Sequence, residues 1–224
     1  MMNNLFSIFD PSSSLNYSMN WFSSLYMLMF IPMLFWFYPS RYLIFWVKIL
    51  NILTYEFKVL MFSKSNYLCI FMMLSLFIHI MLSNFLGMFP YFFTSSSHMI
   101  MSLALSLSLW VSFNLYGWIK YTNNMMIHLT PQGTPGVLMS FMVLIELVSN
   151  IIRPWTLAIR LSANMIAGHL LLTLMSSMGN SLGLILVILL ILLQMLLMIL
   201  EVSVSFIQAY VFTVLSTLYS SEVN

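Results

Sequence analysis

Arg160 is the residue of this chain whose chemistry is hardest to explain by packing. It precedes 40 consecutive residues, 161–200, that include no Asp, Glu, Lys or Arg. A charge at membrane depth costs about 2.5–3.5 kcal/mol on insertion scales, so it is seldom kept without a partner or a role in transport. We therefore expect the function to centre on this guanidinium. The alternative is a structural ion pair with Glu146 or Glu201.

Polar residues recur on one face of the sequence around Arg160. At 100° per residue they fall within an arc of about 80° on a helix, and they are Glu146, Asn150, Arg153, Arg160 and Asn164. A second set spans about 60° of a later helix, and it consists of Gln194, Glu201, Ser205 and Gln208. A lipid-facing helix gains nothing from such stripes, so each is expected to face protein, water or a moving charge.

His169 and Glu201 have side chains that could exchange a proton near neutral pH. His169 lies about 180° around the helix from Arg160, and it could face the second helix near Glu201. A histidine beside a carboxylate in a wet pocket is suited to passing protons. A satisfied interhelical hydrogen bond without transport is the alternative for Glu201.

The remaining members of the stripes could be structural. Asn164 and Gln208 could belong to the site, or their amides could tie helices together, as amides commonly do in membranes. Arg153 follows Glu146 by seven residues, two helical turns, so we expect these two to pair and Arg153 to be architectural. Asn150 is assigned to the same structural polar group.

Composition fixes the class of protein that must position these residues. Of 224 residues, 62% are hydrophobic and 5% are charged, against about 25% charged in a typical soluble domain. The net charge of +2 comes without a Lys/Arg cluster, which argues against nucleic-acid binding. Cys69 is the single cysteine, which excludes an intrachain disulfide and a cysteine metal site. The chain is expected to be an all-α integral membrane protein.

The hydrophobic pattern predicts about five membrane helices and one interfacial helix in a single membrane domain, 1–224. The predicted elements are a first span at 21–38, an interfacial amphipathic helix at 41–64, spans at 66–90 and 99–119, and two long helices at 136–178 and 181–219. The 41–64 segment holds four of the seven basic residues. By the positive-inside rule, it and Lys120 should lie on the matrix or cytoplasmic side, which places the N-terminus outside.

The last two predicted helices are too long to stand upright in a bilayer. At 1.5 Å per residue they would run to about 64 and 58 Å, twice the roughly 30 Å of hydrocarbon. Pro154 could kink the first of them, and the second contains no proline. A steeply tilted hairpin is therefore favoured over two broken helices.

The segment 150–169, NIIRPWTLAIRLSANMIAGH, resembles the signature of subunit a of F-type ATP synthases in its mitochondrial form. The resemblance extends to SNFLGMFPY at 83–91, the turn at 131–135, Glu201 with Gln208, and the tail 215–224. The first ten residues have neither a secretory n-region nor a transit-peptide composition. This N-terminal composition and the chain length are similar to those of an arthropod-type member encoded in the mitochondrion.

The resemblance implies a role for each polar residue. Arg160 would face a ring of c subunits whose carboxylates carry protons, with Asn164 and Gln208 beside that contact. His169 and Glu201 would line a half-channel from the intermembrane space, and Glu146 would line the exit to the matrix. Bacterial relatives have an acid where this chain has His169, which suggests that His169 and Glu201 work as a pair.

The resemblance also implies the partners and the location. The partners would be the c-ring, the peripheral stalk, other membrane-sector subunits and the lipid bilayer, with protons as the transported ion. No cofactor or metal is expected, and the chain would not itself catalyse ATP formation. It would be a multi-pass protein of the mitochondrial inner membrane, with its N-terminus in the intermembrane space and its C-terminus toward the matrix.

Two other classes of membrane protein fit the pattern less well. An antiporter-like subunit of a redox complex would carry lysines within broken helices, whereas every lysine here precedes residue 121. A haem or copper enzyme would need histidines at ligand positions on facing helices. The four histidines, His79, His98, His128 and His169, fall on different predicted segments without paired spacing.

Overall fold

The computed structural model describes residues 5–223, apart from 15–16, 34, 36, 62–66, 90–91, 131–134, 137 and 180–182. Within these residues the regular structure is helical, with one isolated bridge between Ser14 and Tyr17. The elements are η1 (Leu5–Phe9), η2 (Met19–Phe22), α1 (Ser23–Tyr26), η3 (Met27–Phe30), α2 (Arg41–Leu60), α3 (Tyr67–Gly87), η4 (Ser95–Ser97), α4 (Met99–Lys120), α5 (Thr122–Leu129), α6 (Met139–Met178) and α7 (Leu184–Val223). The predicted all-α class is confirmed.

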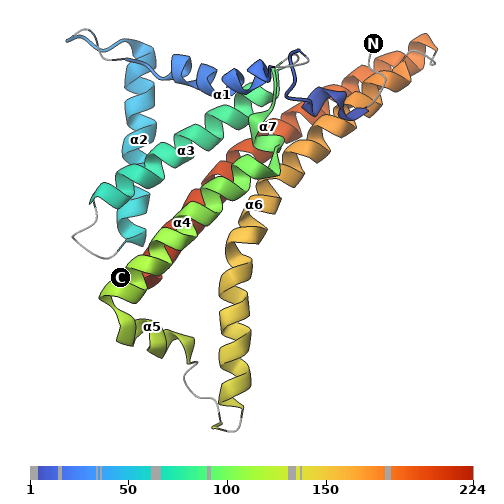
Figure 1. Ribbon diagram of the computed structural model, residues 1–224. Helices are drawn as coiled ribbons and strands as arrows, with labels where there is room; N and C mark the ends of the chain where they lie inside the picture. The colour runs from blue at the N-terminus through green and yellow to red at the C-terminus, as the bar shows by residue number, and fades with distance from the viewer. Residues whose placement is uncertain are drawn as a thin grey trace.

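Four helices of the described chain are long and apolar enough to cross a membrane: Cys69–Gly87, Met99–Lys120, Met139–Met178 and Leu184–Ser221. They correspond to α3, α4, α6 and α7, which form the central bundle in Figure 1. Each of them contains a long uncharged run of the sequence. Such a run can lie in lipid as a helix, because a helix satisfies its backbone hydrogen bonds internally.

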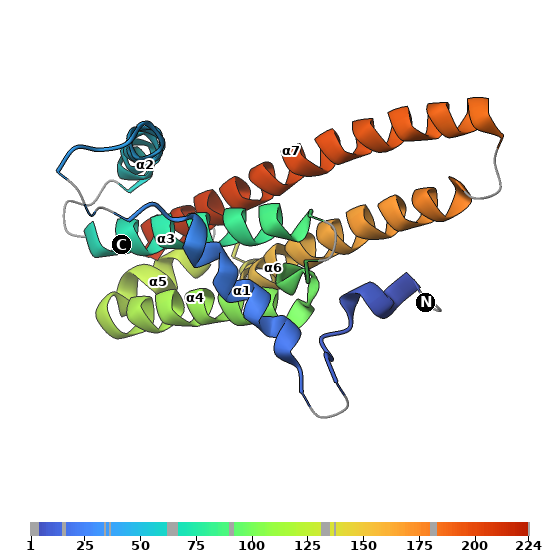
Figure 2. The ribbon, with the colours of Figure 1, turned by 90° about the horizontal axis from the view of Figure 1, so that it is seen from above.

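The predicted first span at 21–38 is not a continuous helix in the structure. A short helical run, η2 to η3, ends at Phe30, and the next residue, Ile31, is extended with ψ 118°. The reason is Pro32, because a residue that precedes proline is pushed out of the α region. The run crosses α3 at a steep angle in Figures 1 and 2 and is fixed there by Met27, which packs on Leu82 and Leu86.

Helix α2 occupies most of the segment predicted as an interfacial helix. It begins after Ser40, whose hydroxyl accepts a hydrogen bond from the N–H of Leu43 at 3.4 Å, as N-capping serines do. It ends at Leu60, and residues 62–64 of the predicted helix lie outside the described residues. Leu53 and Phe57 pack into the bundle. Its placement at the membrane surface stays a prediction.

Small residues let the central helices approach closely. The buried residues of α4 are Ser102, Ser106 and Gly117, and Ala158 and Ala209 are fully buried on α6 and α7. The two serine hydroxyls donate to carbonyls one turn back in their own helix, at 3.1 and 3.3 Å. Both hydroxyls are thereby satisfied without water. Association of the helices at these positions rests on van der Waals packing, as expected in lipid.

The predicted hairpin is confirmed. Helices α6 and α7 contain 40 residues each, about 60 Å at 1.5 Å per residue. They run side by side, and the ends nearest residues 178 and 184 project beyond α3 and α4 (Figure 2). Helix α6 is bent (Figure 1), and it contains Pro154, which cannot donate to Asn150 and allows a kink.

Candidate functional site

Arg160 lies at the surface of α6, on the hairpin. The side chain is exposed and borders a small hollow between α6 and α7. The hollow is lined by Leu157, Arg160, Leu161, Gln208, Val211 and Phe212. Among the described residues no carboxylate lies within 4.0 Å of its guanidinium, since Glu146 pairs with Arg153 and Glu201 lies beside His169. The alternative of a structural ion pair with Glu146 or Glu201 is therefore not what the structure has.

Arg160, Gln208 and Asn164 lie close to one another on the hairpin. Gln208, on α7, is half-buried and borders the same hollow as Arg160. Asn164 is half-buried one turn further along α6. The site therefore offers one exposed cation near two half-buried amides, beside a hollow whose other lining residues are apolar. Such a surface can attract and orient an anion that comes from outside the chain.

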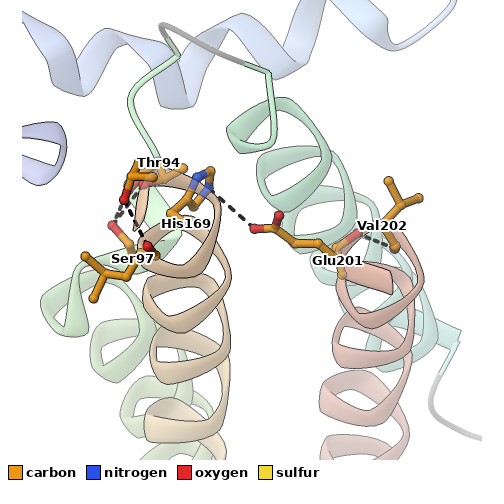
Figure 3. Close-up of polar contacts among 8 residues, drawn as sticks. Thr94, Ser97, His169, Glu201 and Val202 are labelled. Atoms are coloured by element: carbon orange, nitrogen blue, oxygen red, sulfur yellow. Dashed lines mark hydrogen bonds and ion pairs between the residues drawn. The ribbon is translucent and has the colours of Figure 1, made fainter. Parts of the chain in front are cut away.

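His169 and Glu201 meet between α6 and α7, as the helical angles suggested. Nε2 of His169 lies 4.0 Å from Oε1 of Glu201, and the two side chains are only 13% and 7% exposed. Figure 3 shows them pointing toward each other from neighbouring helices. The separation exceeds the length of a direct hydrogen bond but is short enough for coupled titration or for one bridging water.

The polar atoms of this pair are buried without protein partners. His169 Nε2 and both carboxylate oxygens of Glu201 accept or donate no hydrogen bond within the part of the chain that the structure describes. The side-chain amide of Asn84 on α3 is also fully buried, and neither its nitrogen nor its oxygen has a hydrogen-bond partner among the described residues. Each such group costs about 1–3 kcal/mol if left unsatisfied. These residues are therefore suited to a hydrated passage rather than to a packed core.

The sequence did not single out several neighbours of His169 as site residues. The ring of Phe9, in η1, meets the His169 ring edge-on with centroids 6.3 Å apart. Thr94 and Ser97 lie beside His169 in Figure 3, where the Thr94 hydroxyl donates to Ser97 Oγ at 3.1 Å. Both residues fall between the spans predicted at 66–90 and 99–119, an interval for which the sequence predicted no site role. No local signal marked Phe9.

Glu146 and Arg153 form the expected ion pair at the other end of the bundle. Arg153 Nη2 lies 3.7 Å from Glu146 Oε1, and the guanidinium also lies over the Tyr219 ring at 5.3 Å. The pair borders a cavity of about 540 Å³. Its other polar lining residues are Asn114 of α4, His128 of α5 and Asn150 of α6. The cavity is large enough to hold several water molecules.

The two polar sites lie on opposite sides of Arg160 along α6. Residue 146 precedes Arg160 by about 21 Å of helix and residue 169 follows it by about 14 Å, at 1.5 Å per residue. His169 adjoins the η4 end of α4, while the Glu146 cavity adjoins the α5 end. A cation thus separates two clusters of titratable groups that lie toward different ends of the bundle.

The chemistry available here is proton transfer and electrostatics. No group of three or more His, Cys, Asp or Glu side chains that could hold a metal ion occurs in the described parts of the chain. Histidine and carboxylate side chains can accept and release protons, whereas a guanidinium is a donor that keeps its charge. Protons can therefore be accepted at either cluster, but not on the guanidinium between them.

The sequence matches the family described as ATP synthase A chain over residues 3–221. It is 56% identical to ATP synthase subunit a of Drosophila yakuba over 224 residues. It is equally similar, at 56%, to ATP synthase subunit a of Locusta migratoria over 224 residues. The protein of the same name from Anopheles quadrimaculatus is 55% identical over 226 aligned positions. In each case the alignment covers 100% of both chains.

Proposed function

The chain belongs to the ATP synthase A chain family, and from that premise we propose that it is the proton-translocating stator subunit of a mitochondrial F-type ATP synthase. Two offset half-channels deliver protons to, and remove them from, carboxylates on a rotating ring of c subunits. The observation that carries the proposal is the exposed Arg160 on the hairpin, which has no carboxylate partner in the described chain. An acidic residue lies on each side of it along the bundle, Glu146 at the border of a cavity and Glu201 in a buried position.

Arg160 makes a passing ring carboxylate lose its proton. A ring carboxylate that faces lipid must be protonated, because the ionised form is too costly there. Opposite a fixed guanidinium the ionised form becomes favourable, so the proton leaves. The exposure of Arg160 supports this role, since a ring helix could reach the guanidinium directly. Gln208 and Asn164 would hydrogen-bond the ionised carboxylate while it passes.

One half-channel passes through each of the two clusters of titratable groups. Protons from the intermembrane space reach the ring through His169 and Glu201, and protons bound for the matrix leave through the cavity of Glu146. The 540 Å³ volume beside Glu146 supports the second passage. A membrane potential of 100 mV biases each charge by about 2.3 kcal/mol, which gives the rotation its direction.

Arg160 also prevents a direct leak between the passages. Its positive charge repels a hydronium, and a guanidinium has no acceptor atom to which a proton could be passed. Every proton must therefore bind to the ring and travel almost a full turn. ATP itself is made elsewhere in the complex, so this chain needs no cofactor.

The exposed hairpin supplies the surface for the ring. Side chains such as Ile159, Leu171 and Ile199 are 43%, 48% and 67% exposed, and α7 is the most apolar of the four candidate membrane helices. The peripheral stalk and other membrane-sector subunits would cover the remaining faces. The chain would be a multi-pass protein of the mitochondrial inner membrane, with its N-terminus in the intermembrane space.

Disulfide cross-linking to the ring tests the proposal. In a Cys69→Ala background, Ala163→Cys places a thiol on the exposed face of α6, and Ala158→Cys places one at a fully buried position. A cysteine is added beside the ring carboxylate, and the intact complex is oxidised. Ala163→Cys should cross-link and Ala158→Cys should not. No cross-link from Ala163→Cys, in a complex that assembles normally, would contradict the proposed ring contact.

A further inference from the structure

The N-terminal segment covers the His169 end of the site. Helix η1 lies alongside α6 (Figure 2), and Phe9 at its end packs edge-on against the ring of His169. The next residue, Asp10, is exposed. An exposed carboxylate therefore follows directly on the aromatic residue that packs against His169. Asp10 is one of five acidic residues in the chain, and this position has no explanation in packing.

Asp10 is held in place by a small turn. Its Oδ1 accepts hydrogen bonds from the N–H of Ser12 at 3.0 Å and from the hydroxyl of Ser12 at 2.8 Å. The backbone N–H bond and then the hydroxyl bond keep the pKa of Asp10 below its usual range. The Asn20 amide donates to the Asp10 carbonyl at 3.2 Å and joins the turn to η2. Asp10 is therefore an ordered anion at neutral pH.

The turn at Asp10 is also linked, through Asn20 and Trp21, to a second set of buried polar atoms. Trp21, next to Asn20, packs on His98 with ring centroids 5.2 Å apart. His98 Nε2 and Ser96 Oγ are buried without a hydrogen-bond partner in the described chain. They belong to the 94–98 segment, whose Thr94 and Ser97 lie beside His169 in Figure 3.

Three titratable groups are linked to the Asp10 turn through the ring contacts of Phe9 and Trp21 and through the pairing of His169 with Glu201. They are His169 on α6, Glu201 on α7 and His98 before α4. Among the described residues at this end of the bundle, no lysine or arginine forms an ion pair with Asp10. The Asp10 side chain is exposed, so its negative charge acts on the surrounding solvent.

We propose that Asp10 collects protons at the outer mouth of the passage that leads to His169 and Glu201. This inference rests on the proposed function and adds a residue to it. A fixed anion at the mouth of a low-dielectric passage raises the local concentration of cations, hydronium included. One unscreened charge at about 8 Å in water changes that concentration about twofold, and salt reduces the effect.

The test compares Asp10→Asn with the unaltered complex in liposomes during proton-driven ATP synthesis. The pH on the intermembrane side is varied at constant membrane potential. We expect Asp10→Asn to slow synthesis about twofold at mildly alkaline pH and low salt, where proton supply limits the rate. The difference should vanish at acidic pH, and it should vanish at high salt.

Two control variants separate collection from structure. Glu56→Gln removes the same charge from α2, where Glu56 accepts a hydrogen bond from Tyr210, and its pH profile should match that of the unaltered complex. Asp10→Glu keeps the charge and should restore the rate at alkaline pH. A structural role would instead make Asp10→Asn slow the rate equally at every pH and salt concentration.

The inference is overturned if Asp10→Asn leaves the pH profile and its salt dependence unchanged, or if the loss is equal at all pH values. Neither result would contradict the proposed function, which depends on Arg160. If Arg160→Ala retained coupled synthesis, the proposed function would fail whatever Asp10→Asn does.

Discussion

Gly168 of α6 and Glu201 of α7 are in direct contact. A Cβ placed on Gly168 would lie 2.8 Å from Cδ and 3.2 Å from Cγ of Glu201, and it would overlap Oε1. Real Cβ atoms do not approach carbon atoms so closely, so the carboxylate occupies space that only glycine leaves open. The absence of a side chain at 168 therefore sets the position of Glu201 opposite His169.

Gly168→Ala is expected to slow proton flux without unfolding the chain. The added methyl must push the Glu201 carboxylate away from His169, whose Nε2 lies 4.0 Å from Oε1. We expect about a tenfold slower flux, equivalent to about 1.4 kcal/mol, in proton-driven ATP synthesis. Gly179→Ala is the matched control, because a Cβ there meets nothing within 4 Å.

A compensating change sharpens this test. Glu201→Asp shortens the side chain by one methylene, so the double variant Gly168→Ala/Glu201→Asp should recover part of the flux. Two residues in contact should show a coupling energy in such a cycle. Strictly additive effects of the two changes would show that the contact does not limit proton transfer.

Glu201→Gln is expected to slow proton flux more severely. Glutamine keeps the shape of the side chain and can hydrogen-bond, but it cannot accept and release a proton. Glu201 is 6% exposed and its carboxylate has no hydrogen-bond partner in the described residues, so the variant should assemble normally. The measurement is passive proton conduction through the membrane sector after the catalytic sector is removed. A rate equal to that of the unaltered complex would exclude Glu201 from the path.

Arg160→Ala is expected to abolish proton-driven ATP synthesis while the complex still assembles. The guanidinium is exposed and has no carboxylate within 4.0 Å in the described chain, so its removal leaves no buried charge unpaired. Assembly is followed by native gel electrophoresis and synthesis by ATP yield under an imposed proton gradient. Coupled synthesis at a normal rate would refute the role given to Arg160.

The sequence predicted much of the fold because its strongest signals are local. Uncharged runs located α3, α4, α6 and α7, since each spanning helix satisfies its own backbone. Helical periodicity also placed His169 toward the second long helix, where Glu201 lies. The prediction of a continuous first span at 21–38 was wrong. Pro32 keeps Ile31 out of the helical region, and this outweighed the hydrophobicity of the segment.

Contacts between distant segments could not be predicted in this way. Phe9 meets His169 across 160 positions of sequence, and neither residue carries a local signal for the other. Thr94 and Ser97 lie beside His169 only because η4 packs on α6. The part of these two residues in the site therefore depends on tertiary structure, which the local sequence does not specify.

The ion pair between Glu146 and Arg153 is expected to add little stability, so the two residues can be tested for transport separately. Their side chains are 39% and 32% exposed and their charged atoms are 3.7 Å apart. Pairs this exposed contribute about 0–1 kcal/mol. We therefore expect a small interaction energy from the variants Glu146→Gln and Arg153→Gln and their combination, measured as heat stability of the assembled complex.

Transport should separate the two residues. Glu146→Gln removes the titratable group that borders the 540 Å³ cavity, so it should slow proton release several-fold. Arg153→Gln leaves that carboxylate in place and should have a smaller effect on the rate, because Arg153 holds Glu146 and packs on Tyr219. The rates are compared during ATP synthesis under one imposed gradient. If Arg153→Gln reduced the rate as much as Glu146→Gln, the cation itself would be part of the release path, and its architectural assignment would have to be abandoned.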